Sequence, residues 1–434
     1  MITFLLLIIP IIFILISKLK VGTFKNPTSI VATWWGGWAF LSLFGLLGLY
    51  IPSNDTYLLI LLFIIFFSIG NLVSIKKYKT EQITINNELT NIAKKKLSIL
   101  YYLQFIVFLI LIPYLIKAIP NIMSMDSSTY RLALFDSDIL YQSSNVRLLL
   151  FDIILEPLIN LGILLGIVGF YLNYKTKKIL LMSILNAIIF SVMTLGRWYF
   201  LKIILFLIIG FIIISQFKRI IPRNVFKKNK RILFFIIPIT SIAMVIMSFI
   251  RAGKEESILF IAYEYLIRYF TAPFIALDTF IHNLHMGEFY FGRVTFTPLD
   301  TIFVYFTRRF DDSVVNISES ISHYTRDFID IGNGYTHNAF YTSIYNFYLD
   351  GGIIALIIIS LVLGIIVGVT YNKFSQRPNL FTASLLILLI YITVIATLRW
   401  EFINLWPMVV IIYLFLLITK VGSKKIKREE HEVK

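Results

Sequence analysis

The chain has 434 residues, of which 58% are hydrophobic and only 15% are charged, whereas an ordinary soluble domain carries about 25% charged residues. This composition excludes a water-soluble enzyme and predicts an all-α polytopic membrane protein. With no cysteine and five histidines, disulfides, Cys-ligated zinc and thiol nucleophiles are excluded, and a metal centre built from histidines is not expected. The net charge of +16 comes from basic residues beside apolar runs, so anionic lipid headgroups explain it better than nucleic acid does.

Apolar runs of about 17 to 25 residues, the length that crosses a bilayer core of ~30 Å, set the predicted organisation. The first run lacks a basic leader and a cleavage site and is therefore predicted to be a retained span. In chain order, the eleven predicted spans are residues 3–17, 29–49, 57–75, 97–116, 148–171, 179–196, 199–217, 232–250, 351–371, 380–397 and 403–419. The predicted regions are 1–250 with eight spans and a first outer loop at 117–147, a large extracytoplasmic loop at 251–350 with interfacial helices, 351–419 with three spans, and a basic cytoplasmic tail at 420–434.

Basic residues are divided unequally between the two sets of loops that would face opposite sides of the membrane. One set, made of short segments, holds 27 of the 40 lysines and arginines, and the other holds twelve, mostly in the long loop. The positive-inside rule makes the first set cytoplasmic. We therefore expect a multi-pass protein of a bacterial plasma membrane, with its N-terminus outside and its C-terminus in the cytoplasm.

The start of the long loop, residues 257–285, is apolar but carries Glu264, Arg268, Asp278 and His282. A charge at the middle of a bilayer costs ~2.5–3.5 kcal/mol on insertion scales, which argues against a twelfth span. We instead expect helices that lie at the outer interface, with Glu264 and Arg268 one turn apart as a supporting pair.

The end of the long loop carries the most informative pattern. A His337-Asn338 pair is followed by an aromatic run of helical length, then by Asp350, two glycines and Ile353-Ile354-Ala355-Leu356 at the start of a span. This segment resembles the end of the large periplasmic loop in the O-antigen polymerase (Wzy) and O-antigen ligase superfamily, which reads His-Asn, a few apolar residues, an acid and Gly-Ile-Ile-Gly-Leu. Ala355 replaces the usual glycine, and the acid is Asp where ligases more often have Glu. The resemblance covers some twenty residues, the span layout and the two large outer loops.

The resemblance implies a GT-C-like helical fold and glycosyl transfer from an undecaprenyl-diphosphate-linked sugar at the outer face of the membrane, without a cofactor. It favours a polymerase of lipid-linked oligosaccharide repeat units that makes a surface polysaccharide, with membrane lipids, a chain-length regulator and a flippase as partners. An O-antigen ligase-like glycosyltransferase is the nearest alternative. A transporter or flippase of lipid-linked glycans would show short loops, charges at mid-bilayer and internal symmetry. A membrane O-acyltransferase would need a motif for an acyl donor, and none is recognisable.

Glycosyl transfer from a diphosphate needs a proton acceptor for the attacking hydroxyl. His337 suits this catalytic role because an ordinary histidine pKa of ~6.5 leaves the ring neutral near pH 7. Its alternative role is that of a capping or interfacial residue. Asn338, Asp350 and Tyr335 are candidates for orienting the substrate or the imidazole, although asparagine is also a common helix N-cap.

The leaving diphosphate needs positive charge, which guanidinium groups supply through paired hydrogen bonds. Ten arginines and only three lysines fall on the predicted outer side, if Lys202, which is assigned to the beginning of a span, is counted with them. Arg197 stands out because it occupies the short turn at residues 194–198 and resembles an arginine that superfamily members carry at the outer end of a span. Its alternative role is a headgroup anchor beside Trp198. Further predicted diphosphate-binding residues are Arg131, Arg251, Arg308 and Arg309.

Acidic residues give three weaker signals. Residues 136–138 have the Asp-x-Asp form of metal-binding sugar transferases, but Asp and Ser are also turn residues and no nucleotide-binding domain presents them, so no metal site is predicted. Asp152 and Glu156 lie one turn apart in a span, where buried acids are functional by default. Arg399 and Glu401, in the last outer turn, either complete the site or form a local ion pair.

Overall fold

The chain is predominantly helical, as the sequence predicts. The computed structural model describes residues 2–76, 91–135, 139–141, 146–216, 236–249, 258–283, 289–308, 310–311, 313–317, 321, 327–338 and 340–418. In these residues, seven helical segments are long and apolar enough to cross a membrane: α1 (Ile2–Val21), α3 (Asn54–Ser74), Lys95–Ser124 of α4 (Asn91–Ser124), η2 (Arg147–Leu155) continued by α7 (Glu156–Tyr171), α8 (Lys177–Thr194), α9 (Trp198–Ser215) and α15 (Ser343–Gln376). Shorter apolar helices are Ile236–Phe249, α16 (Leu380–Ile395) and α17 (Trp406–Tyr413) with its continuation η4 (Leu414–Ile418).

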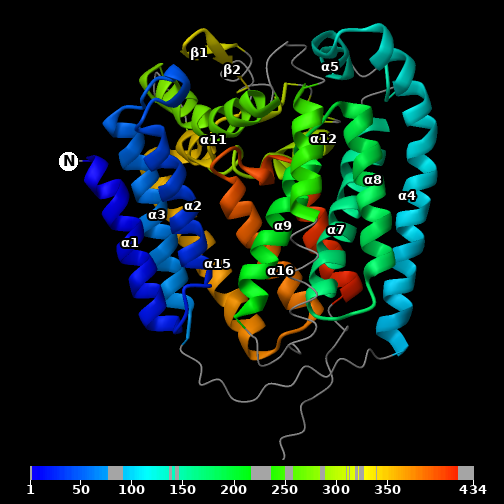
Figure 1. Cartoon of the computed structure of the whole chain (residues 1–434), viewed down its shortest axis with the longest axis horizontal. Helices are drawn as coiled ribbons and strands as arrows, with labels where there is room; N and C mark the ends of the chain where they lie inside the picture. Colours follow the sequence, from blue (N-terminus) through cyan, green and yellow to red (C-terminus); the bar gives the residue numbers. More distant parts are fainter. Residues whose placement is uncertain are drawn as a thin grey trace, which may run out of the picture.

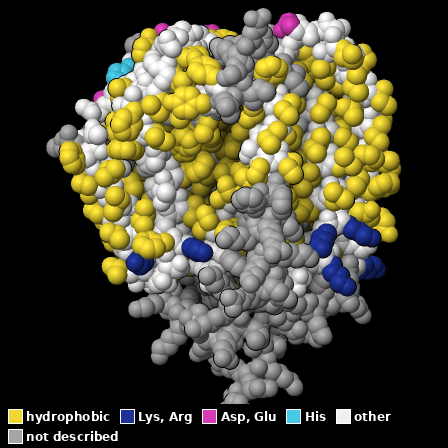
Figure 2. All heavy atoms as spheres, viewed as in Figure 1, with side chains coloured by type: hydrophobic (Ala, Val, Ile, Leu, Met, Phe, Trp, Pro, Cys, Tyr) yellow, Lys and Arg dark blue, Asp and Glu magenta, His cyan; other side chains and the backbone are white. Residues whose placement is uncertain are grey.

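The helices run back and forth between two ends of the molecule (Figure 1). One end, called the loop end below, carries α5 (Ser127–Phe135), α11 (Ile258–Asn283), α12 (Thr297–Thr307) and the strands β1 (Ile329–Gly332) and β2 (Tyr335–His337). Lysine and arginine side chains gather near the opposite end, called the basic end, and the acidic and histidine side chains seen in this view lie at the loop end (Figure 2). The basic tail predicted at 420–434 lies outside the described residues.

Some helices begin or end several residues away from the predicted span boundaries. The α4 helix continues past residue 116 to Ser124, because Lys117 and Asn121 are compatible with a helix even though they end the apolar pattern. In the other direction, α2 (Pro27–Ser42) ends before residue 49, and the 3₁₀ turn η1 (Leu46–Gly48) follows.

Close packing of α3 against α15 relies on glycine. A Cβ atom added at Gly70 would lie 2.2 Å from the carbonyl oxygen of Leu361, and one added at Gly364 would lie 2.1 Å from that of Phe67. Small residues at these positions let the two backbones approach each other, which is how membrane helices gain packing energy when no hydrophobic force drives them together.

The loop end is assembled on the turn between α2 and α3. The chain reverses between β1 and β2 at Asn333-Gly334, where both residues have positive φ, 53° and 72°. This Asn-Gly pair is typical of a tight hairpin turn. The hairpin docks through a backbone hydrogen bond from Tyr50 N–H to the Ile331 carbonyl, at 2.9 Å, and thereby positions His337 at the end of β2.

The α11 helix lies across the loop end (Figure 1) and its charged residues face protein partners. The predicted ion pair is confirmed, since Arg268 Nη1 lies 2.9 Å from Glu264 Oε1. Asp278 accepts hydrogen bonds from the backbone N–H of Ser53, at 3.0 Å, and from the hydroxyl of Thr56, at 2.7 Å, at the start of α3. The seven long apolar segments do not include α11.

The α15 helix begins at Ser343, eight residues before the predicted span, and changes direction at Gly351-Gly352. Gly352 has φ 63° and ψ −146°, a conformation that favours glycine strongly. Just before the break, the carbonyls of Leu349 and Asp350 are turned toward the chain that precedes α12. They accept hydrogen bonds from the backbone N–H groups of Tyr290 and Phe291, which ties the chain before α12 to α15.

Candidate active site

A short turn at the loop end positions Arg197. The α8 helix ends with Leu195 in the left-handed conformation, φ 47°, and the N–H of Gly196 closes the turn on the Ser191 carbonyl at 2.9 Å. Arg197 is then the N-cap residue of α9. The turn is so short that the guanidinium is carried at the junction of two membrane-length helices.

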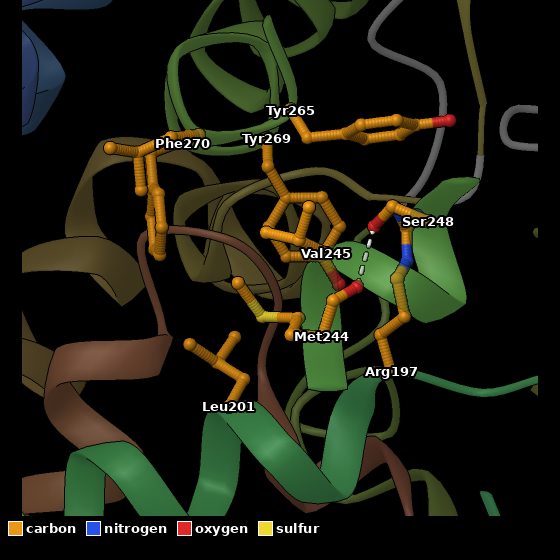
Figure 3. A pocket seen from close by; sticks show the side chains of 9 residues that line it. Arg197, Leu201, Met244, Val245, Ser248, Tyr265, Tyr269 and Phe270 are labelled. Atoms are coloured by element: carbon orange, nitrogen blue, oxygen red, sulfur yellow. Dashed lines mark hydrogen bonds between the residues drawn. The ribbon is translucent and has the colours of Figure 1, made fainter. Parts of the chain in front are cut away.

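Neutral groups surround Arg197. Its Nη1 donates a hydrogen bond of 2.7 Å to the hydroxyl of Ser248, and its guanidinium carbon lies 4.5 Å from the ring centre of Tyr265 and 5.7 Å from that of Tyr269. No carboxylate among the described residues forms an ion pair with it. Figure 3 shows the side chain beside a partly open pocket. The pocket walls are otherwise mainly apolar: Leu201, Met244, Val245, Leu266 and Phe270.

Two further arginines lie against aromatic rings in the same region, and each has a carboxylate partner. The guanidinium of Arg268, which is bound to Glu264, lies 5.2 Å from the Tyr265 ring and 5.2 Å from the Tyr335 ring. The guanidinium of Arg399 lies 4.1 Å from the ring centre of Trp198, the residue that follows Arg197. Stacking of this kind lowers the cost of placing a cation in a site with little water.

His337 joins this group through Phe340. Its Nε2–H donates a hydrogen bond of 2.8 Å to the Phe340 carbonyl, so a neutral imidazole keeps its lone pair on Nδ1. The Phe340 ring stacks on Trp198 with 5.9 Å between ring centres and lies 5.7 Å from Tyr269. Burial lowers the pKa of His337 below 6.5, and the nearby charge of Arg268 lowers it further, against a raising effect of the Phe340 hydrogen bond. The ring is therefore neutral and able to accept a proton at pH 7.

These residues form one continuous group that we call the arginine–aromatic cluster. It consists of Arg197, Trp198, Tyr265, Arg268, Tyr269, Tyr335, His337, Phe340 and Arg399, from four separate stretches of the chain. Three of the predicted site residues, Arg197, His337 and Tyr335, are thus brought together. Asn338 follows His337 and is half-buried, and the backbone N–H of Phe340 donates to its carbonyl.

Other predicted residues lie elsewhere or outside the described part of the chain. Arg131 is a half-buried residue of α5, which packs on α4. Arg308 is exposed at the end of α12, where its Nε donates to the Val314 carbonyl at 2.9 Å. The predicted positions that fall outside the described residues are Arg251, Arg309, Asp136 and Asp138.

Asp350 is held by backbone and not by the cluster. Its two carboxylate oxygens accept hydrogen bonds from the N–H groups of Val294, at 3.0 Å, and Thr295, at 2.8 Å, and the side chain is buried. These bonds anchor the loop before α12 on the bend of α15. The geometry assigns Asp350 a scaffold role, whereas the sequence pattern suggested that it orients the substrate.

A buried ion pair, Lys202 with Glu156, lies near the cluster, and the sequence pattern predicted a role for only one of its two members. Lys202, fully buried in α9, donates from Nζ to Glu156 at 3.2 Å, and its Nζ lies 4.1 Å from the ring centre of Trp406. Glu401, also fully buried, accepts a hydrogen bond from Trp406 Nε1 at 2.7 Å. The functional interest of Glu156 was predicted from its place in a span, but Lys202 was assigned only to the beginning of the next apolar run. A lone lysine inside such a run is the signal that would have found the pair.

The described residues contain no group of three or more acidic or histidine side chains able to hold a metal ion. No protein-family model, curated protein or solved structure matches the chain.

Proposed function

We propose that the protein is a membrane glycosyltransferase that polymerises undecaprenyl-diphosphate-linked oligosaccharide repeat units into a surface polysaccharide. One observation carries the proposal: Arg197, a cation without a described carboxylate partner, lies at the edge of a mainly apolar pocket lined by α9, the apolar helix Ile236–Phe249 and α11. A ligand that suits both features is an amphiphile with an anionic head and a hydrocarbon tail. A polyprenyl diphosphate has this chemistry, and the superfamily resemblance supplies the sugar.

The cluster offers the two functions that such a transfer requires. An acceptor hydroxyl oxygen attacks the anomeric carbon of the donor sugar, and the bond from that carbon to the diphosphate oxygen breaks with its electron pair on the diphosphate. Arg197 neutralises the charge that develops on the leaving group. His337 takes the hydroxyl proton on Nδ1, because its Nε2–H is engaged by Phe340.

The proposed topology has eleven spans, formed by the seven long segments with α2, Ile236–Phe249, α16 and α17–η4. It places the loop end and the N-terminus outside and the C-terminus in the cytoplasm. The naturally Cys-free chain permits a direct test with single cysteines at Ser124 and Gln376, both exposed and near opposite ends of the bundle. A membrane-impermeant maleimide added to intact spheroplasts is expected to label only Ser124→Cys. Labelling of Gln376→Cys alone would invert the topology.

The activity is tested with purified protein reconstituted in liposomes and supplied with undecaprenyl-diphosphate-linked repeat units. We expect a ladder of lengthened glycans and release of one undecaprenyl diphosphate for each bond formed. Transfer that occurs only to a different acceptor lipid would indicate a ligase-like enzyme. Movement of the lipid-linked unit across the bilayer without release of undecaprenyl diphosphate would indicate a flippase and contradict the proposal.

A further inference from the structure

The turn between α16 and α17 contributes a second arginine whose binding capacity is only partly used. Arg399 Nε lies 3.5 Å from Glu401 Oε1, and the guanidinium rests on Trp198. A guanidinium has five N–H donors, of which four are on the two terminal nitrogens. No described hydrogen bond engages the terminal nitrogens of Arg399, and the side chain keeps 22% of its surface exposed.

Glu401 holds this arginine from the interior side. The carboxylate is fully buried; Trp406 Nε1 donates to its Oε2 at 2.7 Å, and the Tyr391 hydroxyl donates to its Oε1 at 3.4 Å. A buried carboxylate fixed on both oxygens stays in one orientation, and its charge lets the neighbouring guanidinium remain charged away from water. Glu401 thus lies on the Nε side of the Arg399 guanidinium, and the two terminal nitrogens remain available to a ligand.

Arg268, the other arginine of the cluster, has the opposite arrangement. Glu264 binds one of its terminal nitrogens, Nη1, at 2.9 Å, so a paired contact from its terminal nitrogens to a phosphate would compete with that ion pair. Arg399 has no such competitor among the described residues. Since Arg197 and Trp198 are adjacent in the chain, the contact of Arg399 with Trp198 also brings its guanidinium to the turn that carries Arg197.

We propose that Arg399 binds the second phosphoryl group of a prenyl diphosphate whose first phosphoryl group is bound by Arg197, and that Glu401 is the positioning residue for Arg399. The inference rests on the proposed function, because it concerns the same lipid donor. It explains how a site built for one anionic group distinguishes a diphosphate from a monophosphate: the second phosphoryl group gains a charge-assisted contact that a monophosphate lacks.

The test measures binding of two probes, farnesyl diphosphate and farnesyl monophosphate, to the full-length protein in detergent by isothermal titration. The wild-type protein is expected to bind the diphosphate more tightly. Arg399→Lys keeps the charge but loses the planar pair of donors, and we expect about a tenfold loss of affinity for the diphosphate with little change for the monophosphate. Glu401→Gln, which keeps the shape and removes the charge, should lower the preference for diphosphate in the same direction.

The matched control is Arg293→Lys. Arg293 is also held through Nε, 2.6 Å from Asp300 Oδ1, but it lies outside the cluster, so affinity for both probes should remain at the wild-type level. The thermal unfolding temperature of each variant separates a loss of fold from a loss of selectivity.

Each outcome has a definite meaning. One possible result is that Arg197→Lys lowers the affinity for both probes while Arg399→Lys and Glu401→Gln keep the wild-type preference for diphosphate. In that case the assignment of Arg399 is overturned and the proposed function stands. If Arg399→Lys lowers the affinity for the two probes equally, the assignment of Arg399 to the second phosphoryl group is overturned. If the wild-type protein binds neither probe, the proposed function fails, and the inference fails with it.

Discussion

Arg197 and Arg293 are both at the loop end, yet only Arg293 is paired with a carboxylate among the described residues. Arg293 Nε lies 2.6 Å from the buried carboxylate of Asp300, whose other oxygen accepts the backbone N–H of Ile317 at 2.8 Å. This arginine therefore fastens the chain before α12 to the chain after it. Arg197 contacts a serine hydroxyl and two tyrosine rings beside a pocket. The partner of a cation, more than its residue type or its place in a loop, therefore separates a structural arginine from one that is available to a ligand.

The largest expected effect comes from removing each arginine in turn. Arg197→Ala should lower turnover on lipid-linked repeat units by about 10³–10⁵-fold, the range found when an arginine that stabilises a charged phosphate transition state is lost. Arg293→Ala should retain turnover for each folded molecule and lower the amount of folded protein instead. Polymer formation per unit of membrane protein measures both effects. Equal activity of the two variants would remove the distinction.

His337→Ala tests whether proton transfer is separate from anion binding. We expect turnover to fall by about 10²–10⁴-fold, the usual contribution of a positioned base. The Kd for farnesyl diphosphate should stay near the wild-type value, because the histidine is not a diphosphate ligand in this account. A large increase in that Kd would show instead that His337 belongs with the anion-binding residues.

Asp350→Ala extends the comparison to the acidic residue of the same sequence segment. Removing the carboxylate leaves the buried N–H groups of Val294 and Thr295 without acceptors, at a cost of about 2–4 kcal/mol of unfolding free energy. We expect a lower unfolding temperature and lower membrane abundance, with turnover retained by the molecules that fold. Normal stability combined with lost turnover would contradict the scaffold role and favour a substrate contact.

The smallest expected effect is a pH dependence that distinguishes His337 from the arginines, which stay charged throughout. Because burial lowers its pKa in the folded state, the unfolded chain takes up a proton below about pH 6.5 that the folded chain does not. Stability is therefore lost as the pH falls from 6.5 toward the lower folded pKa. The unfolding temperature should fall less between pH 7.5 and 5.5 in His337→Ala than in the wild type. An identical fall in the two proteins would remove His337 as the cause.

Local patterns predict much of the helical framework. Apolar runs locate α8, α9 and α16 to within a few residues, because membrane-length burial is a property of the run itself. The ion pair of Glu264 and Arg268 was predictable for a similar reason, since residues four apart meet on one helix face. The hairpin was missed, although Asn333-Gly334 between alternating residues is a known turn signal.

The rest of the site depends on contacts between distant segments. Nothing near Arg399 in the chain indicates that its guanidinium lies on Trp198, about two hundred residues earlier. Asp350 shows the same limit, because its partners are more than fifty residues earlier in the chain. A sequence motif selects residue types, and tertiary packing decides which of them face the ligand.

An experimental structure of the protein in nanodiscs with undecaprenyl diphosphate would show directly whether Arg197 binds the lipid diphosphate. We predict density for phosphate against the guanidinium of Arg197, with the first prenyl units in the pocket beside Leu201 and Met244. Phosphate density at Arg293 or Arg308, with that pocket empty, would contradict the account.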